Sequence, residues 1–257
     1  MKTVKRYLSQ NIGRVEIVGV GGTGSYLAEG LAKMISGYRK PLDVYLVDPD
    51  VIEEKNIYRQ NFLYHEIGMN KAEALALRLN QKYGLKFAAK PQAFEKPDYG
   101  WNTLFVGCVD NIPTRREHLA GVRHYLDCGN GRDFGQVVYG NNPSENELFK
   151  ELEQWDKRAT VSALPSPAAV LDFDHWNPPP EVASCADHPF GEQGCFINEW
   201  VASAALGILH QLLVLGSLST PMIAVNFAQG RMVPSSITQE YFRKHISTHK
   251  EETADGN

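Results

Sequence analysis

Short apolar runs alternate with longer segments of helical spacing through the first half of the chain. Four of these runs are rich in β-branched or aromatic residues and end at polar or glycine positions, as buried strands do. Apolar residues recur every three or four positions in segments 24–36 and about 70–83, and Pro113 suits the first turn of a further helix. The alternation predicts an α/β fold with a Rossmann-like, doubly wound and mainly parallel sheet. The strands are expected at residues 14–19, 43–47, 103–108 and 124–126.

The pattern changes after Gly140. A polar helix is indicated at 145–157, and proline-rich sequence with little periodicity follows it. Long connections of this kind are uncommon within a compact domain and are usually functional. We therefore interpret residues 141–195 as a long crossover loop.

Regular structure returns in the last part of the chain. A strongly apolar helix is predicted at 196–215. Its apolar stripe is wider than one sheet-facing side needs, which makes a dimer contact one interpretation, and ordinary core burial is the favoured one. Segments 221–227 and 231–235 are typical of a closing pair of strands. We expect one domain over residues 1–243, followed by a polar tail over residues 244–257.

Composition excludes several classes of protein. The 257 residues carry a net charge of -4, and no lysine or arginine cluster alternates with aromatics, which disfavours a nucleic-acid partner. The start lacks the apolar core of a signal peptide, and His210 and Gln211 interrupt the longest apolar stretch, which argues against a membrane span. The cysteines form no CxxC pair, so a disulfide framework and a four-cysteine zinc site are both disfavoured. A cytoplasmic protein is the simplest interpretation.

A glycine-rich loop joins the first predicted strand to the first helix. Residues 19–24 read GVGGTG, which is the GxGxxG pattern between a strand and a helix. Glycines there permit a tight turn and bring backbone N–H groups close to a phosphate. Asp48 ends the second strand, where a carboxylate can accept hydrogen bonds from ribose hydroxyls. A nucleotide site is therefore predicted, with a ligand-free glycine turn and an NAD- or FAD-binding dehydrogenase as alternatives.

Four further polar residues favour a nucleoside triphosphate. Asn56 and Arg59 follow the second strand, Lys71 opens the next predicted helix, and Asp110 follows the strand at 103–108. An arginine and a lysine near the glycine loop can hold a polyphosphate and neutralise its charge. An aspartate at the carboxyl end of a parallel strand lies on the ligand side of the sheet, where it can hold Mg²⁺.

Five separate motifs occur in order between Val15 and Gly131. They are GxGGTGS, DPDxVxxxNxxRQ, GxNK, CVDN and TR. Together they resemble the ThiF/MoeB branch of the ubiquitin-activating enzyme superfamily. The segments DPDVIEEKNIYRQ, LDCGNGRDFGQVVYG and CFINEWVASAAL are most similar to the PRTRC-system ThiF family. That family is associated with plasmid-borne gene clusters that contain ubiquitin-like, conjugating-enzyme-like and deubiquitinase-like components.

The resemblance implies an ATP-dependent adenylation. In that superfamily the C-terminal carboxylate of a small ubiquitin-like protein attacks the α-phosphorus of ATP, and pyrophosphate leaves. The acid after the second strand binds ribose, which would be Asp48 here. The phosphates would lie against the glycines of the loop, which are Gly19, Gly21, Gly22 and Gly24.

The same resemblance assigns the charged residues. Asn56 and Arg59 would contact the triphosphate, Lys71 would reach a phosphate, and Asp110 would position Mg²⁺. The expected cofactors are ATP and Mg²⁺. The expected partners are a ubiquitin-like protein, a conjugating-enzyme-like protein and a second copy of this chain in a homodimer.

A cysteine nucleophile is a further expectation, because some relatives pass the acyl group to a cysteine in the crossover loop. Cys185 lies there, and His188 could help to generate its thiolate. Cys195 competes with it, because a helix N-terminus lowers the pKa of a thiol. A zinc site made of Cys185, His188 and Cys195 is a third interpretation. The two CxxC pairs that hold zinc in many relatives are missing from this chain.

The sequence leaves other functions open. A Rossmann oxidoreductase and a non-catalytic scaffold that recruits conjugation partners are the alternatives from other classes. An adenylating enzyme that acts on a small molecule or an RNA base is a third. Arg6 and Arg14 both lie near the start, and the sequence does not decide between them for the arginine that relatives insert into a partner's site.

Overall fold

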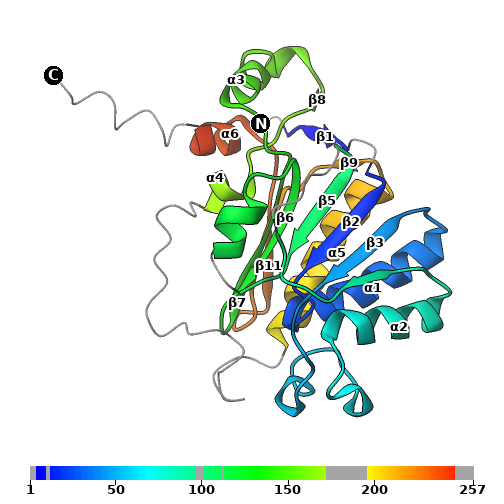
Figure 1. Cartoon of the computed structure of the whole chain (residues 1–257). Helices are drawn as coiled ribbons and strands as arrows, with labels where there is room; N and C mark the ends of the chain where they lie inside the picture. Colours follow the sequence, from blue (N-terminus) through cyan, green and yellow to red (C-terminus); the bar gives the residue numbers. More distant parts are fainter. Residues whose placement is uncertain (1–3, 10–11, 96–100, 111–112, 172–195, 247–257) are drawn as a thin grey trace.

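An eight-stranded sheet forms the centre of the molecule (Figure 1). Its order is β11-β10-β7-β6-β5-β2-β3-β4, in which the strands from β6 to β4 run parallel and the other three extend the sheet antiparallel. This arrangement confirms the expected α/β, Rossmann-like sheet. The strands are β2 (Arg14–Val18), β3 (Asp43–Val47), β4 (Ala88–Lys90), β5 (Thr103–Gly107), β6 (His124–Asn130), β7 (Phe134–Gly140), β10 (Met222–Asn226) and β11 (Arg231–Ser235). The computed structural model describes residues 4–9, 12–95, 101–110, 113–171 and 196–246.

Three long helices cover one face of the sheet (Figure 1). They are α1 (Gly22–Tyr38), α2 (Lys71–Tyr83) and α5 (Ile197–Leu213). Because side chains alternate along a strand, Val15 and Ile17 of β2 both point to this face, and both are fully buried in the larger hydrophobic core. The predicted helices at 24–36 and 70–83 are α1 and α2.

The opposite face has a smaller core of its own. Val18 of β2 and Phe105 of β5 pack there with Leu119, which belongs to the short π-helix η3 (Thr114–Leu119). Helix α4 (Pro167–Leu171) closes this core from outside. The sheet is therefore covered on both faces, as a doubly wound fold requires.

Helix α5 is the apolar helix that the sequence predicted at 196–215. It packs beside α1 on the same face of the sheet and covers β6, β7 and β10. The ideal Cβ of Gly30 in α1 would stand 2.1 Å from Cδ1 of Leu206, so the two helices approach closely. Ile208 and Leu209 are fully buried, which confirms that the apolar stripe serves the core. In the part of the chain that the structure describes, no helix combines the length and apolarity needed to cross a membrane.

A second, three-stranded sheet ties the start of the chain to its later half. β1 (Arg6–Leu8) pairs with β8 (Thr160–Val161) in parallel and with β9 (Ser217–Leu218) in antiparallel fashion. Tyr7 is fully buried and accepts a hydrogen bond of 3.3 Å from the hydroxyl of Tyr139 in β7. The remaining short elements are η1 (Glu54–Asn56), η2 (Tyr64–Glu66), α3 (Glu145–Glu153), η4 (Trp155–Lys157) and α6 (Gln239–Ile246).

The β6–β7 hairpin was only partly predicted. The strand expected at 124–126 continues to Asn130 as β6 and pairs with β7, which the sequence analysis does not predict. Glycines interrupt the alternation there because neighbours approach closely: a Cβ on Gly135 would stand 2.5 Å from Val201, and one on Gly140 would stand 2.1 Å from the carbonyl oxygen of Pro165. Between these glycines the apolar run is limited to Val137, Val138 and Tyr139, which is too short to indicate a strand by itself.

The two ends of the crossover prediction have different outcomes. The polar helix expected at 145–157 is present as α3 and η4, and Ser144 forms a capping box with Glu147 at its start. Residues 172–195 lie outside the described part of the chain.

The polar tail was predicted to begin too early. Lys244 belongs to α6, whose last turn carries three basic residues, a composition that suits the negative end of a helix dipole. Phe242 and Ile246 of the same helix are buried, and this apolar side holds residues 244–246 on the domain.

Substitutions at two glycines should test how closely α1 meets the strand ends. A Cβ on Gly24 would stand 1.9 Å from the carbonyl oxygen of Gly19, so Gly24→Ala should lower the free energy of unfolding by about 3 kcal/mol or more. Gly207 lies exposed in α5 with no atom within 4 Å of an added Cβ, so Gly207→Ala should raise the free energy of unfolding by about 0.5–1 kcal/mol. Urea unfolding measures both, and equal stabilities for the two variants would contradict the close approach.

Candidate functional site

A cavity of about 320 Å³ lies at the carboxyl ends of β2, β3, β5 and β6. The strand order reverses between β2 and β5, and open α/β sheets bind their ligands at such a reversal. The chain brings most of its predicted site residues to this place. Those that line the cavity are Gly19, Gly21, Gly22, Asp48, Arg59, Lys71 and Asp110.

The glycine loop presents main chain to the cavity. Gly19 has a φ of +84°, and its Cβ would stand 2.9 Å from the carbonyl oxygen of Cys108, so only glycine fits there. Helix α1 begins at Gly22, and its N-cap residue Gly21 has no side chain with which to cap the first N–H groups. Uncapped N–H groups at a helix start favour an anion. Gly24 lies behind the loop and has a packing role instead.

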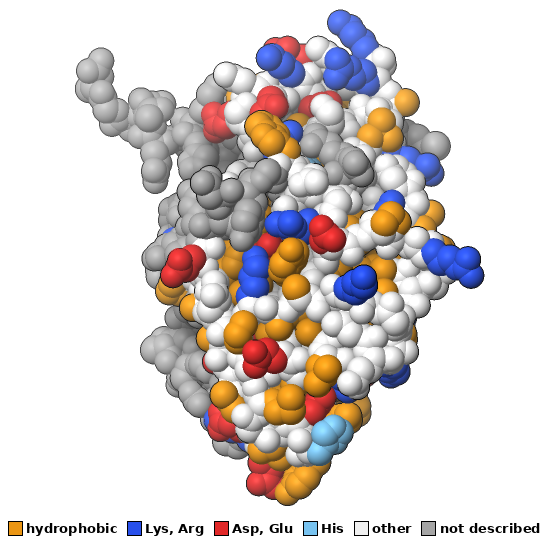
Figure 2. Space-filling model, turned by 45° about the vertical axis from the view of Figure 1, so that its right-hand side comes forward, with side chains coloured by type: hydrophobic (Ala, Val, Ile, Leu, Met, Phe, Trp, Pro, Cys, Tyr) orange, Lys and Arg blue, Asp and Glu red, His pale blue; other side chains and the backbone are white. Residues whose placement is uncertain are grey.

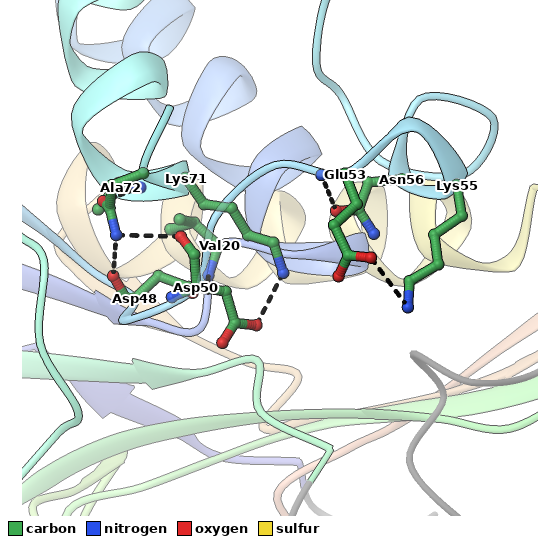
Figure 3. Close-up of polar contacts among 9 residues, drawn as sticks. Val20, Asp48, Asp50, Glu53, Lys55, Asn56, Lys71 and Ala72 are labelled. Atoms are coloured by element: carbon green, nitrogen blue, oxygen red, sulfur yellow. Dashed lines mark hydrogen bonds and ion pairs between the residues drawn. The ribbon is translucent and has the colours of Figure 1, made fainter. Parts of the chain in front are cut away.

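Asp48 joins the end of β3 to the glycine loop (Figure 3). One carboxylate oxygen accepts a hydrogen bond of 2.8 Å from the N–H of Val20, and the other accepts one of 2.9 Å from the N–H of Asp50. Burial raises the pKa of Asp48, and the positive charge of Lys71 opposes that shift. Each oxygen keeps a further lone pair that a ligand hydroxyl can use.

Lys71 carries a buried positive charge at the start of α2. Its side chain is 7% exposed, and its Nζ donates a hydrogen bond of 2.8 Å to Asp50, whose side chain is 61% exposed (Figure 3). The preceding Asn70 caps α2 with its Oδ1 and donates through Nδ2 to the carbonyl oxygens of Asp48 and Asp50, at 3.0 Å each. An anion that enters the cavity must therefore share Lys71 with Asp50.

Asn56 does not line the cavity. It is buried in η1, where its Oδ1 accepts a hydrogen bond of 2.9 Å from the N–H of Glu53 (Figure 3). Its carbonyl oxygen accepts hydrogen bonds from the N–H groups of Arg59 and Gln60. In this structure Asn56 therefore acts on the cavity through the main chain that carries Arg59.

Asp110 is the one predicted metal ligand. It follows β5, is exposed and lines the cavity. Among the described residues no three His, Cys, Asp or Glu side chains are grouped to hold a metal ion. A single carboxylate nevertheless fits Mg²⁺, which usually takes one or two carboxylates and completes its shell with water and phosphate oxygens. Cys185, His188 and Cys195 lie outside the described residues.

The structure adds polar residues that sequence reasoning missed. Gln60, Thr23, Asn130 and Asn198 also line the cavity. The Oε1 atom of Gln60 is buried and has no hydrogen-bond partner within the described part of the chain. Asn130 and Asn198 lie within the two later segments that carry the family resemblance, but nothing in those segments indicates a role at the cavity, and the fold brings both residues there. The signal that could have found Asn198 is its position as an amide in the first turn of a strongly apolar helix.

Binding of pyrophosphate should reveal the competition for Lys71. Asp50→Asn should tighten pyrophosphate binding severalfold, because it removes the anion that occupies Lys71, and Lys71→Met should weaken it by about tenfold or more. Glu53→Gln is the matched control, since Glu53 is also 61% exposed but pairs with Lys55. Isothermal titration calorimetry gives the three affinities, and equal effects of Asp50→Asn and Glu53→Gln would mean that only the net charge matters.

Comparisons with solved structures show the fold. E. coli MccB with SeMet MccA aligns with a TM-score of 0.57 and 15% identity, covering 89% of this chain and 64% of that one. E. coli MccB with ATP aligns with a TM-score of 0.55 and 16% identity, with the same two coverages of 89% and 64%. PaaA aligns with a TM-score of 0.57 and 13% identity, covering 88% of this chain and 64% of that one. This chain therefore spans less than two thirds of the length of these proteins.

Comparison by sequence gives a family for part of the chain. No curated protein sequence matches the chain. The ThiF family matches residues 6–119, which run from β1 through the glycine loop and β5 to the end of η3. Residues 6–119 thus carry the sequence pattern of the ThiF family, within a fold that this chain shares with MccB and PaaA.

Proposed function

We propose that this chain binds Mg-ATP and adenylates the C-terminal carboxylate of a small ubiquitin-like protein. The observation that carries the proposal is the convergence of the glycine loop, Asp48, Arg59, Lys71 and Asp110 on one cavity. The ThiF family match and the fold shared with MccB, which has been solved with ATP, support a nucleoside triphosphate as the ligand.

The cavity offers each part of ATP a suitable contact. The ribose hydroxyls would donate to Asp48, whose carboxylate is already oriented by two main-chain N–H groups. The phosphates would lie over the glycine loop at the start of α1. Arg59 and Lys71 would neutralise the triphosphate, with Asn56 supporting the loop that carries Arg59.

The chemistry requires charge neutralisation and alignment. An oxygen of the acceptor carboxylate attacks the α-phosphorus, the bond from that phosphorus to the bridging oxygen breaks, and pyrophosphate leaves with the bonding electrons. No general base is needed, because a carboxylate is already ionised near neutral pH. Arg59 and Lys71 would stabilise the charge that develops on pyrophosphate. Mg²⁺ held by Asp110 would add positive charge on the phosphate oxygens.

An exposed apolar surface supports a protein partner. Five large side chains between β3 and α2 are 38% to 71% exposed, and they belong to the loops around η1 and η2. Figure 2 shows hydrophobic side chains gathered at the lower end of the molecule, which these loops form in Figure 1. Apolar groups collected in this way mark interaction surfaces. The residues are Val51, Tyr58, Leu63, Tyr64 and Met69.

The finer proposals rest on the sequence resemblance. We assign the chain to the PRTRC-system branch, as a cytoplasmic homodimer that works with a conjugating-enzyme-like protein. MccB, whose fold this chain shares, has been solved with SeMet MccA and with N-formylated MccA. These complexes support a second bound partner beside the nucleotide. After adenylation, the thiolate of Cys185 would attack the acyl carbon of the adenylate, so that a thioester forms and AMP leaves.

Nucleotide-dependent thermal stability tests the proposal. Mg-ATP at about a hundred times its dissociation constant should add roughly 2.7 kcal/mol to the free energy of unfolding, visible as a raised melting temperature. Asp110→Ala should reduce the Mg-ATP effect to that of ATP with a chelator. Asp43→Ala is the control, because Asp43 is an exposed carboxylate at the opposite end of β3. Stabilisation by NAD or FAD alone would favour an oxidoreductase, and no response to any nucleotide would overturn the proposal.

A further inference from the structure

We propose that Asn198 is a positioning residue for the phosphate end of the cavity. Its carboxamide connects the start of α1, the end of β6 and the segment that carries Arg59. This inference rests on the proposed function, because it explains how that cavity would hold Arg59 against a triphosphate. Neither Asn198 nor its neighbour Asn130 falls within the residues that match the ThiF family.

The hydrogen bonds of Asn198 reach three separate elements. Its Oδ1 accepts from the hydroxyl of Thr23 at 3.2 Å and from Nδ2 of Asn130 at 2.6 Å. Its Nδ2 donates to the carbonyl oxygen of Arg59 at 3.3 Å. The side chains of Thr23 and Asn130 and the residue Arg59 all line the cavity, as Asn198 itself does. One side chain therefore joins parts of the cavity wall that are distant in sequence.

The orientation of this amide follows from its neighbours. Asn130 presents an NH₂ group, which requires an acceptor, and Arg59 presents a carbonyl oxygen, which requires a donor. Turning the Asn198 amide over would place NH₂ against NH₂ and oxygen against oxygen. The arrangement is thus specific to a carboxamide, since aspartate lacks the donor and leucine lacks both groups.

Packing holds Asn198 in this position. The residue is 5% exposed, and a Cβ on Gly22 would stand 2.6 Å from its Oδ1. The glycine at position 22 therefore makes room for the amide as well as for the start of α1. A buried amide in such contact has few alternative rotamers.

A bond to the main chain of Arg59 has a consequence for its side chain. The segment around Arg59 is held on one side by the carbonyl of Asn56 and on the other by Asn198. Removing Asn198 would take away the hydrogen bond that its Nδ2 donates to the Arg59 carbonyl and would loosen the hold on this segment. When charged groups are already in position before the ligand binds, less conformational entropy is lost on binding, and the affinity is higher.

The same helix supplies a matched control. Near the other end of α5, Oε1 of Gln211 accepts from the N–H of Ser219 at 3.0 Å and from its hydroxyl at 3.1 Å. Gln211 is also an amide that ties α5 to a neighbouring segment, but it does not line the cavity. Gln211→Ala should therefore change stability without changing nucleotide affinity.

A double-mutant cycle tests the proposal. Mg-ATP affinity would be measured by calorimetry for the wild type, Asn198→Ala, Arg59→Ala, the double variant and Gln211→Ala. Asn198→Ala should weaken binding by about tenfold, the size expected for one or two hydrogen bonds, and by less than about twofold when Arg59 is already alanine. A merely structural role would lower affinity by the same factor in both backgrounds. Asn198→Ser, which keeps a polar first-turn residue in α5, provides the measurement if Asn198→Ala does not fold.

The outcomes separate the two hypotheses. A wild type that does not bind Mg-ATP overturns the proposed function and this inference with it. A wild type that binds Mg-ATP, with Asn198→Ala equally tight or with independent effects of the two substitutions, overturns the positioning role alone. A loss of affinity in Gln211→Ala as large as that in Asn198→Ala would also overturn it.

Discussion

Direct contact between main-chain atoms fixes the place where α1 begins, and the cavity depends on that contact. Gly24 has no side chain, so the first turn of α1 can rest against the carbonyl of Gly19. Gly19 in turn packs on the carbonyl of Cys108 at the end of β5. A side chain at either position would push the helix away from the sheet. The N–H groups at the start of α1 would then no longer face the ends of β2 and β5.

Short polar side chains bonded to main chain hold the rest of the cavity wall. Asp48 fixes the glycine loop through Val20, Asn70 fixes the turn after β3, and Asn198 fixes the segment of Arg59. These bonds use few rotatable groups, so they restrain loops at a small cost in side-chain entropy. The cavity is therefore shaped by neutral amides and one carboxylate that act on the backbone, and its cations lie among them.

Much of the fold and part of the site could be predicted from sequence. Periodicity located four of the five parallel strands and the helices α1, α2 and α5, because burial on one or two faces leaves a regular pattern. The fifth, the three-residue β4, was not predicted because it is too short to show such a pattern. The motifs identified residues on the first half of the sheet, such as Asp48 and Lys71, whose positions follow from the strand ends. Strand β7 was not predicted, because its glycines serve close packing and interrupt the pattern of a strand. Asn198 was not predicted as a site residue, because only the fold brings α5 to the glycine loop. Asn56 was placed in the right segment, but its side chain is directed into the loop and not into the cavity.

The ion pair between Lys71 and Asp50 also determines how many negative charges a ligand needs in order to bind in the cavity. The lysine is buried and the aspartate is exposed, so a carboxylate of the chain itself neutralises the lysine and can swing out into water. A monovalent anion would only replace the single negative charge of Asp50 beside Lys71 with another single charge, so its binding would gain little free energy. A polyphosphate brings several charges and can engage Lys71 and the start of α1 at once, so it can displace Asp50 at a net gain. Because a ligand must displace Asp50, the cavity selects ligands by the number of negative charges they carry, independently of their base or sugar.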